Sequence, residues 1–376
     1  MKKILLCASS ALMLFSCGHP QGGLALIPAE KFDSTINNNP VKLYTLADGD
    51  LTMQVTNFGG RVVSLFTPDK NGEMADIVVG RASLHEYTDP KGERFLGACV
   101  GPVANRIGGA SFTLDGQTYT VPANDNKVNT LHGGYLGLDN VVWDVVSADA
   151  SSIVLHYLRP DGQEGFPGNL DITMTYSLGH GCFKVEYSAT TDKATPVNIS
   201  HHSFFNLRGE GVGTVEDYIM TIAASAYTPI DTLSIPLGQN ESVEGTPFDF
   251  REPHRIGERI GQEGNVQLKN ARGYDHNWVL DGPAGSVRSV CTVWDPECGR
   301  CIEVLTDQPG MQFYSGNFFN GKGGVAKNGK PIEYRSALAL ETQFFPDSPN
   351  QPAFPQITLR PGETYTHTCI YRFGVK

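Results

Sequence analysis

The feature that most constrains the fold is a series of stretches in which apolar and polar residues alternate, punctuated by turns. Residues 51–69 (LTMQVTNFGGRVVSLFTPD) alternate around a Gly-Gly break, and residues 111–121 (SFTLDGQTYTV) have Asp115-Gly116 at their centre. A period of two is typical of β-strands, and Asp-Gly between two such runs predicts a hairpin. Comparable β-patterns continue at 152–162, 170–190, 217–227, 286–295 and 356–374.

Helical signals are sparse by contrast. Residues 83–87 (SLHEY) could form one helical turn, and no strand–helix–strand alternation, no internal repeat and no low-complexity linker appears in the body of the chain. The 42 glycines and 23 prolines are typical of a protein rich in turns. We therefore predict an all-β protein, with one large antiparallel domain over residues 41–376 built as two stacked sheets in a long sandwich.

The N-terminus has the pattern of an export signal. Lys2 and Lys3 precede an apolar run over residues 4–15 that is short for a membrane span. The run ends in Leu-Phe-Ser-Cys, which resembles the lipobox of bacterial lipoproteins, where cleavage before the cysteine precedes its lipidation. An ordinary cleaved signal with an incidental cysteine is the alternative.

The lipoprotein interpretation divides the N-terminal region into two segments. Residues 1–16 are the predicted signal peptide, and residues 17–40 comprise the lipidated Cys17 and a polar tether. Acyl chains would hold the protein on a membrane without a transmembrane helix. The prediction is a protein exported to the bacterial cell envelope, lipid-anchored and facing the periplasm.

Charge and cysteine content exclude some classes of function. The formal net charge is −11 and no basic stripe offsets it, which argues against nucleic acid as a partner but leaves neutral ligands such as sugars. Cys298 and Cys301 have the CxxC spacing of redox and zinc sites. Because residues 297–300 look like a hairpin turn between two β-patterns, we interpret the two cysteines as part of a structural turn.

Several stretches combine polar side chains with glycine, aromatic residues and sharp turns. They are GPVANRIGGASF (101–112), TLHGGYLGLDNVVW (130–143), NISHHSFFNL (198–207), GYDHNWVL (273–280), TDQPGMQFYSGNF (306–318) and ALALETQFFPDSPNQP (337–352). In the last of them Glu341 directly follows the apolar run 337–340. A carboxylate on such a strand is rare unless it is paired or functional.

Together with GTPFDFR (245–251), these motifs resemble the aldose 1-epimerase (galactose mutarotase) family, from about residue 41 to the C-terminus. The resemblance is specific because seven motifs occur in the family's order. It implies a β-supersandwich and an isomerase that interconverts the α and β anomers of free aldohexoses such as galactose and glucose. No cofactor is required for this reaction.

Mutarotation needs a general base for the proton of the anomeric hydroxyl and a general acid for the ring oxygen. Residue by residue, the resemblance implies that Glu341 is the base and His202, directly before S-F-F-N-L, is the acid. Neighbouring strand residues point to opposite faces, so His201 should face away from the pocket and its replacement by Asn should be nearly silent.

The resemblance also implies a set of sugar-binding residues: Asn105, Arg106, His132, Asp275 and Gln312. Local roles remain open for some of them, because Arg106 could be ion-paired, Asp275 could cap a turn and Gln312 could face solvent. His276 is interpreted as structural. Pro102 departs from the arginine common in this family's G-R-x-A-N-R motif, so the local hairpin could differ.

Two other functions fit parts of the sequence. A non-catalytic carbohydrate-binding lipoprotein could reuse the same fold. A glycoside hydrolase would need two flanking carboxylates, which Asp275 and Glu341 could supply, but it would leave His202 without a role. No metal site is predicted: zinc spacing is absent, although His132, His202 and Asp275 have suitable side chains, and Ca²⁺ on surface carboxylates is specified by no motif. We expect a monomer.

Overall fold

The computed structural model describes residues 24–376, so the predicted signal peptide (1–16) and the lipidation site Cys17 lie outside the described residues. Strands dominate and helices are few and short, which confirms the predicted all-β class. Within residues 24–376, no helix has the length and apolar character needed to cross a membrane.

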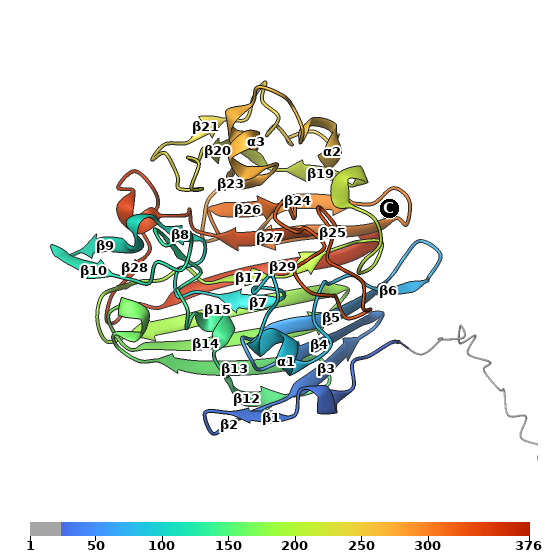
Figure 1. Ribbon diagram of the computed structural model, residues 1–376, viewed down its shortest axis with the longest axis horizontal. Helices are drawn as coiled ribbons and strands as arrows, with labels where there is room; N and C mark the ends of the chain where they lie inside the picture. Colours follow the sequence, from blue (N-terminus) through green and yellow to red (C-terminus); the bar gives the residue numbers. More distant parts are fainter. Residues whose placement is uncertain (1–23) are drawn as a thin grey trace, which may run out of the picture.

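The largest sheet has nine antiparallel strands and extends across the molecule (Figure 1). In spatial order its strands are β12 (Asp144–Ala148), β13 (Ser152–Arg159), β14 (Leu170–Gly179), β15 (Cys182–Thr191), β29 (Tyr365–Val375), β25 (Arg300–Thr306), β24 (Arg288–Trp294), β19 (Ile219–Ile222) and β22 (His254–Arg255). The C-terminal strand β29 therefore lies in the middle of the sheet, between β15 and β25.

A six-stranded and a four-stranded sheet accompany it. The six-stranded sheet has the order β18 (Phe204–Phe205), β27 (Leu338–Gln343), β26 (Gly310–Tyr314), β23 (Asp275–Leu280), β20 (Ala224–Thr228) and β21 (Glu241–Ser242). The four-stranded sheet comprises β3 (Leu43–Asp48), β4 (Leu51–Thr56), β5 (Arg61–Pro68) and β6 (Met74–Asp76).

Five two-stranded pairs complete the strands of the described chain. They are β1 (Ser34–Ile36) with β2 (Asn39–Val41), β7 (Ala98–Val100) with β17 (Ser200–His202), β8 (Arg106–Ile107) with β11 (Thr130–Leu131), β9 (Ser111–Leu114) with β10 (Gln117–Thr120), and β16 (Thr195–Pro196) with β28 (Thr358–Leu359). The β9–β10 pair confirms the hairpin predicted at Asp115-Gly116.

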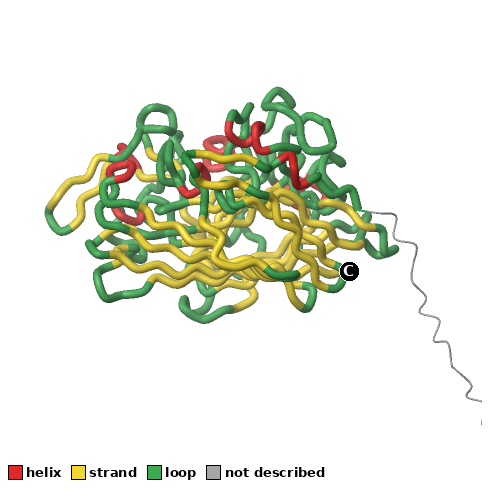
Figure 2. The backbone as a smooth tube through the Cα atoms, turned by 90° about the horizontal axis from the view of Figure 1, so that it is seen from below, coloured by secondary structure: helices red, strands yellow, loops and turns green. Residues whose placement is uncertain are grey.

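The helices are short and gather on one side of the stacked strands (Figure 2). The α-helices are α1 (Leu84–Thr88), at the predicted helical turn, α2 (Ile256–Arg259) and α3 (Val266–Ala271). The 3₁₀ turns are η1 (Ala29–Lys31), η2 (Gly108–Ala110), η3 (Leu138–Asn140), η4 (Gln163–Gly165), η5 (Val215–Asp217) and η6 (Ser348–Asn350).

The main core lies between the large sheet and the six-stranded sheet. Met174 and Tyr176 of β14 share one buried cluster with Trp278 of β23, Phe313 of β26 and Leu340 of β27. Alternate residues of β14 are buried in this layer, as the period of a half-buried strand requires. The predicted sandwich of two stacked sheets is confirmed.

The six-stranded sheet differs because its central strands are covered on both faces. Every residue of β26 and β27 is buried. Leu338 and Leu340 face the sandwich core, whereas Ala339 belongs to a separate buried cluster on the other face. Glu341 shares the face of Ala339, so its carboxylate points away from the sandwich core.

The tether predicted over residues 17–40 extends too far, because its second half belongs to the folded domain. Phe32 is fully buried in a cluster with Val63 and Phe204. The main chain of Ile27 exchanges two hydrogen bonds with the side chain of Gln54, at 2.8 and 2.9 Å. The folded part thus begins before residue 41, because an amide side chain and an apolar cluster hold a segment that has no strand-like alternation of its own.

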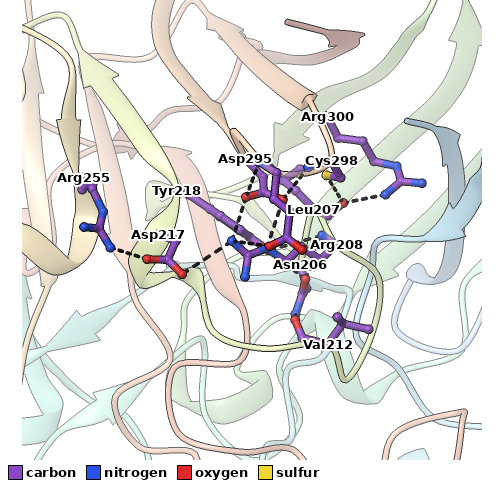
Figure 3. A network of polar contacts seen from close by, with 11 residues as sticks. Asn206, Leu207, Arg208, Val212, Asp217, Tyr218, Arg255, Asp295, Cys298 and Arg300 are labelled. Atoms are coloured by element: carbon purple, nitrogen blue, oxygen red, sulfur yellow. Dashed lines mark hydrogen bonds and ion pairs between the residues drawn. The ribbon is translucent and has the colours of Figure 1, made fainter. Parts of the chain in front are cut away.

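The end of the 198–207 motif is anchored by a polar network (Figure 3). The side-chain amide of Asn206 donates to the carbonyls of Val212 (3.0 Å) and Ser336 (2.7 Å). Arg208 forms a two-pronged ion pair with the buried Asp295, at 3.0 and 2.9 Å. These bonds fix the chain directly after β18 and explain the asparagine of this motif as a structural residue.

Cys298 belongs to the same network. Its thiol donates to the carbonyl of Leu207 (3.3 Å), which also accepts a hydrogen bond from Arg300 (2.9 Å). Cys298 lies in the connection between β24 and β25, and Cys301 lies within β25. Both cysteines are free thiols, and burial raises the pKa of each, which agrees with the interpretation as a structural turn.

Candidate active site

The predicted site residues converge on a cavity of about 110 Å³ on the outer face of the six-stranded sheet. Glu341 comes from β27, Asp275 from β23, His202 from β17 and Arg106 from β8. The complete lining is Glu93, Phe95, Asn105, Arg106, Leu131, His132, His202, Asp275, Tyr314, Phe318 and Glu341. Motifs that are far apart in the sequence therefore form one pocket.

The strand register brings His202 and Glu341 together. In the β18–β27 pair, Phe204 stands opposite Ala339. Two residues before Phe204 and two residues after Ala339, on the same face, the Nε2 atom of His202 lies 3.5 Å from the Oε1 atom of Glu341. Both side chains are almost completely buried. The distance is long for a hydrogen bond but places an imidazole and a carboxyl group beside one reacting centre.

His201 points to the opposite face, as strand alternation predicts. Its Nδ1 atom lies 3.2 Å from the hydroxyl of Tyr176, and its Nε2 atom lies 2.6 Å from the hydroxyl of Ser203. Its ring packs edge-on against Phe183 in the sandwich core. Replacement by Asn should therefore not be silent, because it disturbs a buried hydrogen-bonded group, although the residue stays out of the pocket.

The A-N-R and L-H-G-G motifs hold each other in place. The backbone N–H of Asn105 donates to Nδ1 of His132 (3.1 Å), and the backbone N–H of His132 donates to the carbonyl of Asn105 (2.9 Å). Because Nδ1 accepts, the neutral ring carries its proton on Nε2. A Cβ atom at Gly133 would lie 2.0 Å from the carbonyl oxygen of Gly101, so this position requires glycine.

Burial shifts the titration of the central pair in opposite directions. Desolvation raises the pKa of Glu341 well above its usual range, and the negative charges of Asp275 and Glu93 raise it further. Desolvation lowers the pKa of His202 to about 4. These shifts favour the protonated form of Glu341 and the neutral form of His202.

Three buried polar atoms in or beside the site have no hydrogen-bond partner in the described residues. They are Nδ1 of His202, Oε2 of Glu341 and Oε1 of Gln312. Buried polar atoms in native proteins are nearly always paired. Orphaned atoms of this kind identify a place where a polar ligand completes the hydrogen bonding.

Arg106 lines the cavity and is also ion-paired. Its Nε atom donates to Asp125 at 2.9 Å, which confirms the ion pair considered from the sequence. The pair orients the guanidinium and leaves the two terminal nitrogens without a hydrogen-bond partner among residues 24–376. Asn105 adopts a positive φ of 61°, which asparagine tolerates, and its side-chain oxygen accepts from the backbone N–H of Arg106.

Asp275 and Gln312 have different positions. Asp275 lines the cavity, and burial raises its pKa despite the opposing effect of Arg106. The amide of Gln312 donates to Asp275 at 2.7 Å, and Gln312 is not among the residues that line the cavity. Gln312 faces Glu341 across the β26–β27 ladder. The structure thus places Gln312 beside Asp275, where it orients the carboxylate.

His276 is structural, as interpreted from the sequence. Its Nδ1 atom accepts from the backbone N–H of Asp275 (3.3 Å), and its Nε2 atom lies 3.1 Å from Oε1 of Gln267. Burial lowers the pKa of His276 to about 3, so the ring is neutral. It packs against Phe248 on the core side of β23.

Sequence reasoning missed Glu93, Phe95 and Phe318. Phe95 packs on His132 with a ring separation of 4.5 Å, and Glu93 adds a third carboxyl group to the lining. Backbone hydrogen bonding to Phe95 orients the Glu93 side chain, whose pKa is raised by burial. The segment GERF has no periodic pattern, so nothing in its letters indicated that it enters the pocket.

The donor set does not fit a divalent metal well. Ligand atoms of His132, His202 and Glu341 lie within 4.8 Å of one another. A metal on Nε2 of His132 would require the ring proton on Nδ1, where the backbone N–H of Asn105 already points. Two donors would then face each other.

Comparison with known proteins gives the same picture over nearly the whole chain. The family model described as aldose 1-epimerase matches residues 42–372. A galactose mutarotase from Rattus norvegicus is 40% identical over 338 residues, which cover 89% of this chain and 94% of the relative. An aldose 1-epimerase from Escherichia coli K12 is 35% identical over 341 residues, which cover 90% of this chain and 96% of the relative.

Solved structures of aldose epimerases have the same fold as this chain. An aldose epimerase homologue from C. elegans superposes with a TM-score of 0.81 at 28% identity, covering 89% of this chain and 99% of the other. A galactose 1-epimerase from Lactobacillus acidophilus gives a TM-score of 0.78 at 27% identity, covering 92% and 97% of the two chains.

Proposed function

The chain belongs to the aldose 1-epimerase family and interconverts the anomers of aldoses, and we propose that Glu341 and His202 carry out the proton transfers of this isomerisation. The family assignment rests on a match from residue 42 to residue 372. A purely sugar-binding lipoprotein and a glycoside hydrolase are not favoured, since the relatives carry the names of isomerases.

Ring opening requires two proton transfers at one centre. Glu341 takes the proton of the O1 hydroxyl, the C1–O1 bond becomes a carbonyl, and the bond between C1 and the ring oxygen breaks. His202 gives its proton to the ring oxygen, which leaves as a hydroxyl. The open aldehyde rotates about C1–C2, and the same two residues work in reverse to close the ring on the other face.

The pKa shifts of the two residues affect the starting point of this cycle. Before opening, the pair is a carboxylate and an imidazolium; after opening, it is a carboxylic acid and a neutral imidazole. Burial raises the pKa of Glu341 and lowers that of His202, so the second state is favoured in the pocket. Ring opening therefore starts from the less favoured protonation state, which the bound sugar has to stabilise, and reclosure returns the pair to that state.

The remaining polar residues of the lining hold the sugar in this proposal. His132 offers an Nε2–H donor, Arg106 offers its terminal guanidinium nitrogens, and Asp275 offers carboxylate oxygens that Gln312 orients. Asn105 adds its side-chain amide. A free hexose such as galactose or glucose matches this mixture of donors and acceptors. Proton transfer alone is required, so we propose that neither a cofactor nor Ca²⁺ is needed.

The observation that carries the proposal is the pairing of two almost fully buried groups, His202 and Glu341, which line one cavity and each keep a polar atom without a partner among the described residues. Polarimetry on fresh α-D-galactose tests it, and the purified protein should accelerate the approach to equilibrium above buffer. Glu341→Gln and His202→Asn should each lower kcat by about 10²-fold or more, which is typical of one acid–base contribution.

Matched controls are available on the large sheet. Glu303→Gln on β25 and His156→Asn on β13 change the same residue types far from the cavity and should leave kcat unchanged. A folded Glu341→Gln or His202→Asn variant with near-wild-type kcat would remove that residue from the mechanism.

The cellular location is a separate proposal. The basic residues Lys2 and Lys3, the apolar run 4–15 and the lipobox-like Cys17 support an exported, lipid-anchored enzyme that faces the periplasm. We also propose that the enzyme acts as a monomer.

A further inference from the structure

The strands that carry His202 and Glu341 are not joined by a backbone ladder. Phe204 and Phe205 of β18 pair with β27, but β17 instead pairs with β7, with His202 opposite Ala98. The pairing with β27 therefore includes β18 but not β17, the strand on which His202 faces Glu341. Some other set of bonds must set the separation of the two groups.

Side chains replace the missing ladder. The hydroxyl of Ser200 donates to the carbonyl of Thr342 (2.9 Å). The backbone N–H of Phe344 donates to the side-chain oxygen of Asn198 (2.9 Å), and the Asn198 amide donates back to the carbonyl of Phe344 (3.3 Å). These bonds tie the two strands in register.

His367 connects the two strands from the side of the large sheet. It comes from β29 in the centre of the large sheet, and its ring is 1% exposed. Its Nδ1 atom donates to the carbonyl of Ile199 at 2.9 Å, which places the ring proton on Nδ1. Its Nε2 atom then accepts from the hydroxyl of Thr342, also at 2.9 Å. One imidazole thus joins the segment just before β17 to the residue that follows Glu341.

The same strand makes further polar contacts across the core. The hydroxyl of Tyr371 donates to the carbonyl of Leu340 (2.9 Å), and the hydroxyl of Tyr365 accepts from the backbone N–H of Ile199 (3.1 Å). Glu341 therefore stands between two residues that are both bonded to β29. Burial lowers the pKa of His367 to about 4, which keeps its Nε2 atom an acceptor near neutral pH.

We propose that His367 is a positioning residue: by bridging Ile199 and Thr342 it sets the distance between His202 and Glu341 for the two proton transfers. The inference rests on the proposed roles of these two groups. His367 touches neither the cavity nor the sugar, so its loss should disturb the chemical step more than sugar binding. A small misplacement of reacting groups can lower a rate by about 10²-fold.

Two variants break the same bond from its two sides. Thr342→Val removes the donor, and His367→Asn keeps a donor for Ile199 but removes the acceptor for Thr342. Each should lower kcat about 10-fold or more. KM should change less than about two-fold, because Asn105, His132 and Asp275 are untouched. Thr342→Ser keeps the hydroxyl donor, so its kcat should stay close to that of the wild type.

Thr228→Val is the matched control. Thr228 is buried in the same six-stranded sheet and its hydroxyl donates to Asn240 at 3.0 Å, but it lies outside the bridge. It should lower the melting temperature comparably and leave kcat unchanged. If His367→Asn fails to fold, the comparison of Thr342→Val with Thr342→Ser decides.

The proposal is overturned if folded Thr342→Val keeps wild-type kcat, or if Thr228→Val lowers kcat equally. An active wild-type enzyme with unaffected bridge variants refutes the bridge alone. A wild-type protein without mutarotase activity refutes the function and the bridge together.

Discussion

At the scale of single residues, the adjacent histidines of the 198–207 motif show how one backbone step separates two roles. His202 faces Glu341 in the cavity, whereas His201 faces Tyr176 in the core. Strand alternation predicts that only one of the two faces the pocket, and the S-F-F-N-L motif identifies it as His202. It does not reveal that His201 is hydrogen-bonded at both ring nitrogens, since Tyr176 and Ser203 reach it only in the folded chain.

We predict that His201→Asn destabilises the protein by about 1–3 kcal/mol at pH 7.5, because it disturbs buried hydrogen bonds, while kcat of the folded enzyme is retained. Burial lowers the pKa of His201 to about 3 in the folded state, against about 6.5 when unfolded. Below pH 6.5 only the unfolded wild type gains this proton. The stability advantage of the wild type should therefore shrink by about 2 kcal/mol between pH 7.5 and pH 5.

Urea denaturation at several pH values measures this trend. Ser203→Ala is the control, since it removes one hydrogen bond of His201 but keeps the titrating ring. Its destabilisation should stay nearly constant with pH. A His201→Asn penalty that does not change with pH would contradict a neutral buried imidazole.

At the scale of elements, regular alternation was a reliable guide and short segments were not. The β9–β10 hairpin lies where Asp115-Gly116 predicts it. By contrast, the sequence missed the folded segment that contains η1, β1 and β2, because three-residue strands are too short to show a period. Nor could it show that β17 leaves β27, since strand partners are chosen by contacts distant in the chain.

Phe32→Ala tests the newly assigned start of the folded domain. Phe32 is fully buried between η1 and the rest of its cluster, so we expect a loss of about 3–5 kcal/mol in the free energy of unfolding. Leu26→Ala, at a side chain that is 40% exposed, should have little effect. If both substitutions have equally small effects on the denaturation midpoint, the segment that contains Phe32 is a tether and not part of the folded domain.

At the scale of the whole molecule, we expect the proposed membrane anchor to leave the active site unaffected, because no residue that lines the cavity precedes Glu93. The residues that line the cavity lie between Glu93 and Glu341, far from Cys17 in the sequence. The folded part of the described chain spans residues 24–376. Anchoring should therefore change where the enzyme acts and not how fast it turns over.

Cys17→Ser checks this separation in a bacterial host. The variant should move from the membrane fraction to the soluble fraction of the cell envelope, because an acyl chain supplies the membrane affinity. Its kcat in polarimetry should equal that of the wild type. A variant that stays in the membrane fraction would contradict lipidation at Cys17.

The sequence by itself determined the all-β class, the predicted hairpin at Asp115-Gly116 and the family, because alternation, turn chemistry and ordered motifs are local properties of the chain. It also separated His201 from His202. Only the tertiary structure decided that Glu93 enters the cavity, that Gln312 orients Asp275, that Nδ1 of His132 is occupied and that His367 bridges the two active strands. These features depend on distances between atoms of remote segments, such as His367 and Ile199, which are 168 residues apart. No local pattern encodes such a distance.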